Sequence, residues 1–151
     1  MGLLKLAGVS STSAAALHLL VIVVGRPAYR YFGAGDQMAS MAEHGSPTPA
    51  LVTAGLTLVF TVWAAYAFSG AGRLRRLPLL RTGLVVIGLI YALRDLLLVP
   101  EVLWLLSGRT PPVQPRQLIF SLAALVTGLA YLVGTQRAWS SLRRRTPSGQ
   151  V

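Results

Sequence analysis

The chain contains no cysteine and only four acidic residues among its 151. Without thiols it can form no disulfide, thiol redox relay, thioether-linked haem or cysteine-ligated zinc site. Charged residues make up 12% of the sequence and hydrophobic residues 54%, a balance too apolar for an ordinary soluble domain. The composition therefore indicates a membrane protein.

Four apolar stretches of near-membrane length divide the chain almost evenly. An α-helix rises about 1.5 Å per residue and a bilayer core is about 30 Å thick, so ~17–25 residues can span it. The sequence thus predicts an all-α, integral membrane four-helix bundle, in one domain over residues 1–145 with a disordered tail at 146–151. The predicted spans cover residues 6–24, 50–68, 82–99 and 118–135.

The basic residues lie in the loops and tails around these spans, apart from Arg94. In a soluble protein a net charge of +10 would favour nucleic acid as the partner. Arginine clusters beside apolar helices are instead what anionic lipid and the positive-inside rule select. The expected partners are the lipid bilayer and anionic lipid at its cytoplasmic face, not nucleic acid.

The two sides of the predicted bundle carry unequal numbers of basic residues. With the N-terminus inside, nine face the cytoplasm and four face outward, which favours cytoplasmic termini. The use of arginine for all basic residues but Lys5 is typical of a high-GC bacterial source, so we expect a bacterial-type inner membrane. The inner group is Lys5, Arg73, Arg75, Arg76, Arg81, Arg137, Arg143, Arg144 and Arg145, and the outer group is Arg26, Arg30, Arg109 and Arg116.

Prolines and capping residues predict where helices begin and end. The first span should end near Gly25 and Pro27, and Asp36 should cap a short outer helix over residues 36–44. The third span should either kink at Pro100 or end there, and Pro115 suits the first turn of the last helix.

Two patterns indicate how the spans pack. Thr53, Thr57 and Thr61 form a stripe at i, i+4 and i+8, in which each hydroxyl can bond the carbonyl one turn back or face another helix. Ala124 and Gly128 form a small-xxx-small face that permits close approach of a neighbouring helix.

One group of polar residues lies where the bilayer should be. Arg94 and Asp95 of the third span share a depth in the outer half with His18 of the first, and Tyr91 shares a face with Asp95. An intramembrane charge costs about 2.5–3.5 kcal/mol on insertion scales, so it calls for a function or a partner. We predict an outward-facing polar pocket built from His18, Tyr91, Arg94 and Asp95, with the 36–44 segment as its lid.

Arg94 has several possible partners. Glu101 lies on the same face two turns away if the helix continues, and Asp36 or Glu43 could be reached by snorkelling. Alternatively, Arg94 and Asp95 satisfy each other or neighbouring carbonyls and only fix the helix register. No metal site is expected, because His18, His44, Asp36 and Glu43 lack zinc-type spacing, and no cofactor is expected either.

Three classes of function fit this pattern. The first is a protein that binds a lipid-like or small amphipathic ligand, or that serves as an accessory subunit of a membrane complex. The second is a small dimeric transporter, although the first helix offers His18 where drug exporters of similar architecture carry a coupling carboxylate. The third is an intramembrane enzyme with Asp95 or His18 as acid–base group and Arg94 as anion holder.

Overall fold

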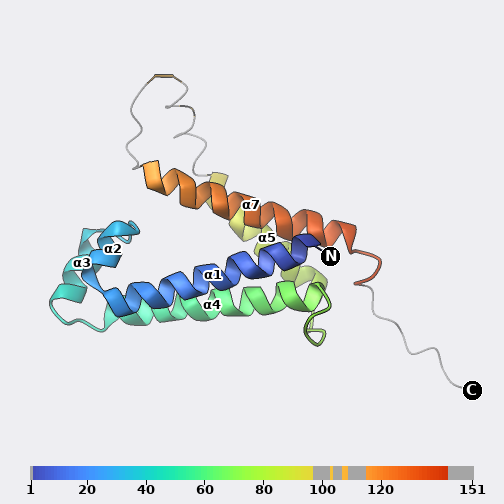
Figure 1. Cartoon of the computed structure of the whole chain (residues 1–151), viewed down its shortest axis with the longest axis horizontal. Coiled ribbons are helices and arrows are strands. Elements are labelled where there is room, and N and C mark those ends of the chain that lie inside the picture. The colour runs from blue at the N-terminus through green and yellow to red at the C-terminus, as the bar shows by residue number, and fades with distance from the viewer. Residues whose placement is uncertain (1, 97–102, 104–106, 109–114, 143–151) are drawn as a thin grey trace, which may run out of the picture.

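The computed structural model describes residues 2–96, 103, 107–108 and 115–142, with backbone alone at 95–96 and 115–117. Over these residues the chain forms helices joined by turns, without a strand (Figure 1). The prediction of an all-α chain is confirmed. The helices are α1 (Gly2–Val24), α2 (Arg26–Tyr31), α3 (Asp36–Glu43), α4 (Thr48–Gly70), α5 (Leu80–Leu96) and α7 (Pro115–Arg137).

Three of the helices are long and apolar enough to cross a membrane: α1, α4 and the Leu118–Arg137 part of α7. Each overlaps one predicted span. The described part of α5 has 17 residues, and the predicted third span extends beyond it to residue 99. The alternatives at Pro100 and the tail at 146–151 lie outside the described residues.

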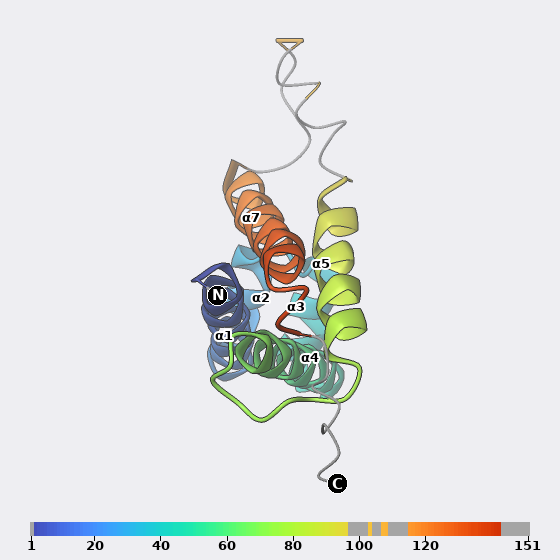
Figure 2. The same cartoon turned by 90° about the vertical axis from the view of Figure 1, so that its right-hand side faces the viewer.

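The four longer helices pack side by side in the order α1, α4, α5, α7, with α7 returning to α1 (Figure 2). Their chain directions alternate. At one end a Cβ on Gly70 would lie 3.1 Å from Leu4 Cδ1 and 2.8 Å from Leu84 Cδ1, and one on Gly134 would lie 3.0 Å from Leu4 Cγ. The start of α1, the end of α4, the start of α5 and the end of α7 therefore meet there.

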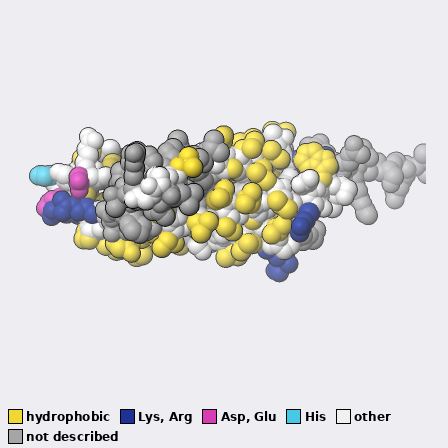
Figure 3. All heavy atoms as spheres, turned by 90° about the horizontal axis from the view of Figure 1, so that it is seen from above, with side chains coloured by type: hydrophobic (Ala, Val, Ile, Leu, Met, Phe, Trp, Pro, Cys, Tyr) yellow, Lys and Arg dark blue, Asp and Glu magenta, His cyan; other side chains and the backbone are white. Residues whose placement is uncertain are grey.

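Many small side chains lie in the interior of this assembly, beside a few large ones such as Leu4, Leu84 and Tyr131, while many large apolar side chains point outward. Ala7 and Ala67 are fully buried, whereas Leu51 is 69% and Val23 83% exposed. Only 17% of the most apolar 18-residue stretch of α4 is buried. Figure 3 shows the resulting apolar surface between two charged ends. Small interior residues and an apolar exterior are typical of helices packed in lipid.

The predicted packing details are confirmed. Thr53, Thr57 and Thr61 each donate to the carbonyl four residues earlier, at 2.7, 3.0 and 2.8 Å. A Cβ on Gly128 would lie 2.9 Å from Tyr91 Cβ and 3.1 Å from the Gly88 carbonyl oxygen, so α5 and α7 touch backbone to backbone there.

Helices α2 and α3 cover the other end of α1 and α4 (Figure 1). The turn from α1 into α2 needs a positive φ, which Gly25 supplies at 71°. Ala28, Tyr29 and Ala39 are buried together with Val21 of α1. The short helix over 36–44 is thus present, ending one residue earlier than predicted.

The predicted cap of α3 is wrong. Asp36 is the first residue of the helix, Gly35 is the N-cap, and no side chain caps the helix. The chain reaches the helix through Gly35 at a φ of 93°, and the Asp36 side chain is 94% exposed, 3.7 Å from Arg30.

Candidate functional site

The centre of the molecule holds a chain of hydroxyl groups that joins all four longer helices. Tyr131 of α7 donates to the backbone carbonyl of Trp63 in α4, at 2.8 Å. The Ser11 hydroxyl of α1 lies 2.9 Å from the Tyr131 hydroxyl and 3.3 Å from that of Tyr91 in α5. Ser11 and Tyr131 are fully buried and Tyr91 is nearly so.

The direction of these bonds follows from the first. Because a carbonyl can only accept, the Tyr131 proton is committed to Trp63. Ser11 must then donate to the Tyr131 oxygen, and Tyr91 must donate to Ser11. Ser11 and Tyr131 therefore each donate and accept, and Tyr91 donates, which is how polar groups are tolerated in a dry interior.

An aromatic group surrounds this chain. The rings of Tyr91 and Tyr131 stack with centroids 5.9 Å apart, and Trp63 meets Tyr91 edge-on at 5.1 Å. Phe60 lies 4.9 Å from the His18 ring and 6.2 Å from the Tyr91 ring. The structure thus places His18 and Tyr91, two of the predicted site residues, near the same phenylalanine.

His18 is half-buried, and its Nδ1 lies 2.7 Å from the Ala14 carbonyl oxygen one turn back. This bond assigns a proton to Nδ1, since a carbonyl only accepts. One of the two ring nitrogens of His18 therefore has its hydrogen-bond partner within α1.

Arg94 lies on an exposed face of α5. Within the described part of the chain it has neither a hydrogen bond nor an ion pair. Its neighbours on that face are apolar and exposed, with Leu93 at 62%. The other exposed members are Val86, Leu89 and Ile90.

The predicted acidic partners lie elsewhere or are not described. Glu43 pairs with Arg26, and Asp36 lies 3.7 Å from Arg30, so both acids join α3 to α2. The Asp95 side chain and all of Glu101 lie outside the described residues. The outward pocket thus stays a prediction, with Arg94 as its described charge.

The described residues contain no group of three or more His, Asp or Glu side chains that could hold a metal ion. His44, one of the residues considered for such a site, bonds the Ser40 carbonyl oxygen at 2.8 Å through Nδ1.

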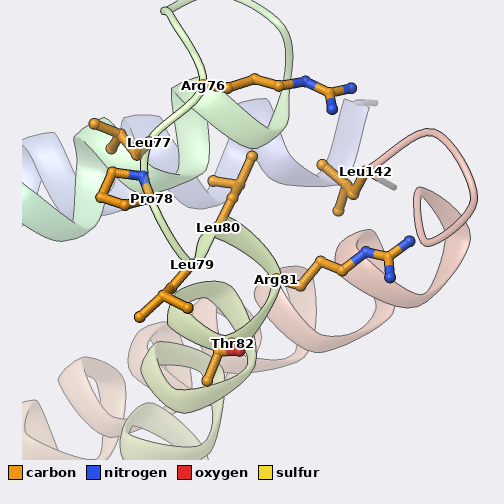
Figure 4. A pocket seen from close by; sticks show the side chains of 8 residues that line it. All are labelled: Arg76, Leu77, Pro78, Leu79, Leu80, Arg81, Thr82 and Leu142. Atoms are coloured by element: carbon orange, nitrogen blue, oxygen red, sulfur yellow. The ribbon is translucent and has the colours of Figure 1, made fainter. Parts of the chain in front are cut away.

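Two adjoining hollows lie at the opposite end, where the α4–α5 loop meets the segment after α7 (Figure 4). The larger has a volume of about 610 Å³ and the smaller about 450 Å³. Arg76 and Leu142 line both. The larger hollow is also lined by Leu77, Pro78, Leu79, Leu80, Arg81 and Thr82.

Sequence reasoning missed the hydroxyl chain and these hollows. Tyr131 carries no signal beyond its place within a span, and Ser11 lies two turns from His18 on α1. The link to the predicted site depends on the length of the Tyr91 side chain, which reaches Ser11 from α5.

Comparison with protein-family models, with curated proteins and with solved structures finds no match to this chain.

Proposed function

We propose that this protein is a four-span integral membrane protein with cytoplasmic termini that acts as an accessory subunit of a larger membrane complex. Its proposed docking surface is the exposed face of α5 that carries Arg94. The partner is a membrane protein that presents a carboxylate at the depth of Arg94.

The observation that carries this proposal is the exposure of Arg94 among apolar side chains. An arginine in hydrocarbon needs a counter-charge or a path to the headgroups. The acids of α3 are occupied by Arg26 and Arg30. The other two acids, Asp95 and Glu101, lie outside the described side chains, and we propose that a partner chain supplies a carboxylate to Arg94.

The interior supports the same reading. The hydroxyl protons in the interior are used in hydrogen bonds among Ser11, Tyr91 and Tyr131 and to the Trp63 carbonyl. Such a closed chain offers a passing solute no open polar group. It therefore gives the transport alternative no support and directs attention to the outer surface.

A second candidate is the binding of a small amphipathic ligand from the outer side. It is favoured by the position of His18, which is half-buried against Phe60 near Tyr91. A ligand with an anionic head could meet Arg94 and place its apolar part against these rings.

Native mass spectrometry of protein extracted gently from its own membrane tests the proposal. We expect a stoichiometric protein partner with the wild type and with Arg94→Lys, which keeps the charge. We expect it to be lost in Arg94→Leu but kept in Leu93→Ala, an uncharged change on the same face.

Retention of the protein partner by Arg94→Leu would refute the docking role of the charge. A co-purifying small molecule without any protein partner would refute the subunit proposal and favour the second candidate. Thermal unfolding of each variant excludes misfolding as the cause of a loss.

A further inference from the structure

The larger hollow lies between the residues that lead into α5 and the segment that follows α7. Figure 4 shows Arg76, Arg81 and Leu142 beside it, from these two distant parts of the chain. Arg76 donates to the Ser141 carbonyl oxygen at 2.7 Å, and Arg81 donates to that of Trp139. These bonds hold the two sides of the hollow together.

Contacts with Trp139 fix the Arg81 side chain in place, but they do not use all the hydrogen-bond donors of its guanidinium group. Its guanidinium lies 4.5 Å from the centre of the Trp139 ring, while one Nη donates to the Trp139 carbonyl. Its Nε is buried and has no hydrogen-bond partner in the described part of the chain. Buried N–H groups are nearly always bonded in folded proteins. The Nε therefore lacks an acceptor among the described residues and can bond one supplied to the hollow.

The charges around the hollow are of one sign. Arg73, Arg75, Arg76 and Arg81 lie in or beside the α4–α5 loop, and the described ion pairs of the acids are on α2 and α3 at the far end. An anion near the hollow thus meets no described carboxylate. Guanidinium groups bind phosphate oxygens in a paired, planar geometry.

The rim of the hollow is apolar. Leu79 is 76% exposed and adopts a φ of 51°, a conformation that few residues other than glycine take up. Leu74, which lines the smaller hollow, is 52% exposed, and Trp139, whose ring lies against Arg81, is 48% exposed. Exposed leucines and a tryptophan beside arginines are suited to the level where acyl chains meet headgroups.

We infer that this hollow is a binding site for the phosphate of an anionic phospholipid at the cytoplasmic face. The phosphate oxygens accept from Arg81, including its Nε, and from the side of the hollow lined by Arg76. The acyl chains lie against Leu79 and the apolar ends of the helices. The inference rests on the proposed membrane placement but not on docking through Arg94.

Lipid titration of the purified full-length protein in a neutral detergent tests the site. The probes are phosphatidylglycerol and phosphatidylcholine with identical acyl chains, and bound lipid is counted by native mass spectrometry. We expect phosphatidylglycerol to bind about tenfold more tightly, in keeping with a charge-assisted bidentate contact. Arg81→Gln should abolish this preference.

Arg73→Gln is the matched control, because it removes the same charge from the same loop at a residue that lines neither hollow. It should keep most of the preference. Arg81→Lys keeps the charge but lacks an Nε, so it should lose several-fold in affinity for phosphatidylglycerol.

Equal binding of the two lipids to the unmodified protein would overturn the inference, whatever the variants do. So would equal losses in Arg73→Gln and Arg81→Gln, which would indicate a diffuse charge effect. Displacement of phosphatidylglycerol by an equal concentration of inorganic phosphate would show that the acyl chains contribute nothing. Failure of the membrane placement itself would appear separately, as an incorrect topology of the inserted protein.

Discussion

The hydroxyl of Tyr131 donates to the backbone carbonyl of Trp63, 2.8 Å away, and so joins the last long helix to α4. This bond sets the direction of the chain that runs through Ser11 to Tyr91. A single buried tyrosine therefore decides how four helices share their polar contacts.

Tyr131→Phe should destabilise the protein by about 1–2 kcal/mol, because it removes one of the two donors to the Trp63 carbonyl and the acceptor of the Ser11 proton in a dry interior. Tyr91→Phe removes the first donor of the chain, across 3.3 Å, and should cost less. Reversible unfolding in mixed micelles measures both. Equal effects would contradict the inferred direction of the bonds.

The contact between α5 and α7 makes a second prediction. Gly128→Ala places a methyl group 2.9 Å from Tyr91 Cβ and 3.1 Å from backbone atoms of α5, so we expect a loss of about 1–3 kcal/mol. Gly55→Ala is the matched control on α4, because nothing lies within 4 Å of its new Cβ. It should be neutral or stabilise the helix by up to ~1 kcal/mol. A tolerated Gly128→Ala would show that the helices can separate at little cost.

Substitution of Thr135 should change stability in the opposite direction. Its buried Oγ1 has no hydrogen-bond partner in the described part of the chain. Thr135→Val keeps the shape and removes the unsatisfied hydroxyl, so it should be neutral or raise stability by up to ~1 kcal/mol. Thr53→Val should instead lower stability, since it breaks bonds to Pro49 and Tyr29. A clear loss of stability in Thr135→Val would indicate a bound water or ligand at this hydroxyl.

The α2–α3 cap should depend more on packing than on its ion pairs. Glu43→Gln breaks the exposed pair with Arg26 and should cost under about 1 kcal/mol, with an effect that fades at high salt. Tyr29→Ala empties a site that is 2% exposed and should cost about 3 kcal/mol or more. Hydrogen exchange of the α3 amides reports both. A larger effect of Glu43→Gln would mean that the ion pairs hold the cap.

Local rules predicted much of the fold. Helix ends followed from Gly25 and Pro115, and the threonine stripe followed from the i−4 carbonyl bond. These features depend only on neighbours along the chain. The prediction that Asp36 caps α3 was wrong by one residue, because Gly35 takes the cap position at a positive φ and Asp36 begins the helix.

The site was less accessible from the sequence. Shared depth predicted His18, and a shared face with Asp95 predicted Tyr91. Neither could reveal Ser11, whose role depends on a tyrosine 80 positions away on another helix. The inner hollow depends on Arg81 meeting Trp139 across the end of the packed helices. Such contacts arise from packing geometry, which charge counting does not contain.

The central claim, that four helices cross the membrane with both termini inside, can be tested directly because the chain has no cysteine of its own. Single cysteines at Ser46, Arg73, Ser107 and Ser141 would be probed with a membrane-impermeant maleimide in intact and in permeabilised cells. The account predicts labelling of positions 46 and 107 in intact cells, and of 73 and 141 only after permeabilisation. Protection of position 107 in intact cells, with labelling of position 46, would show that α5 does not cross and would contradict the four-span account.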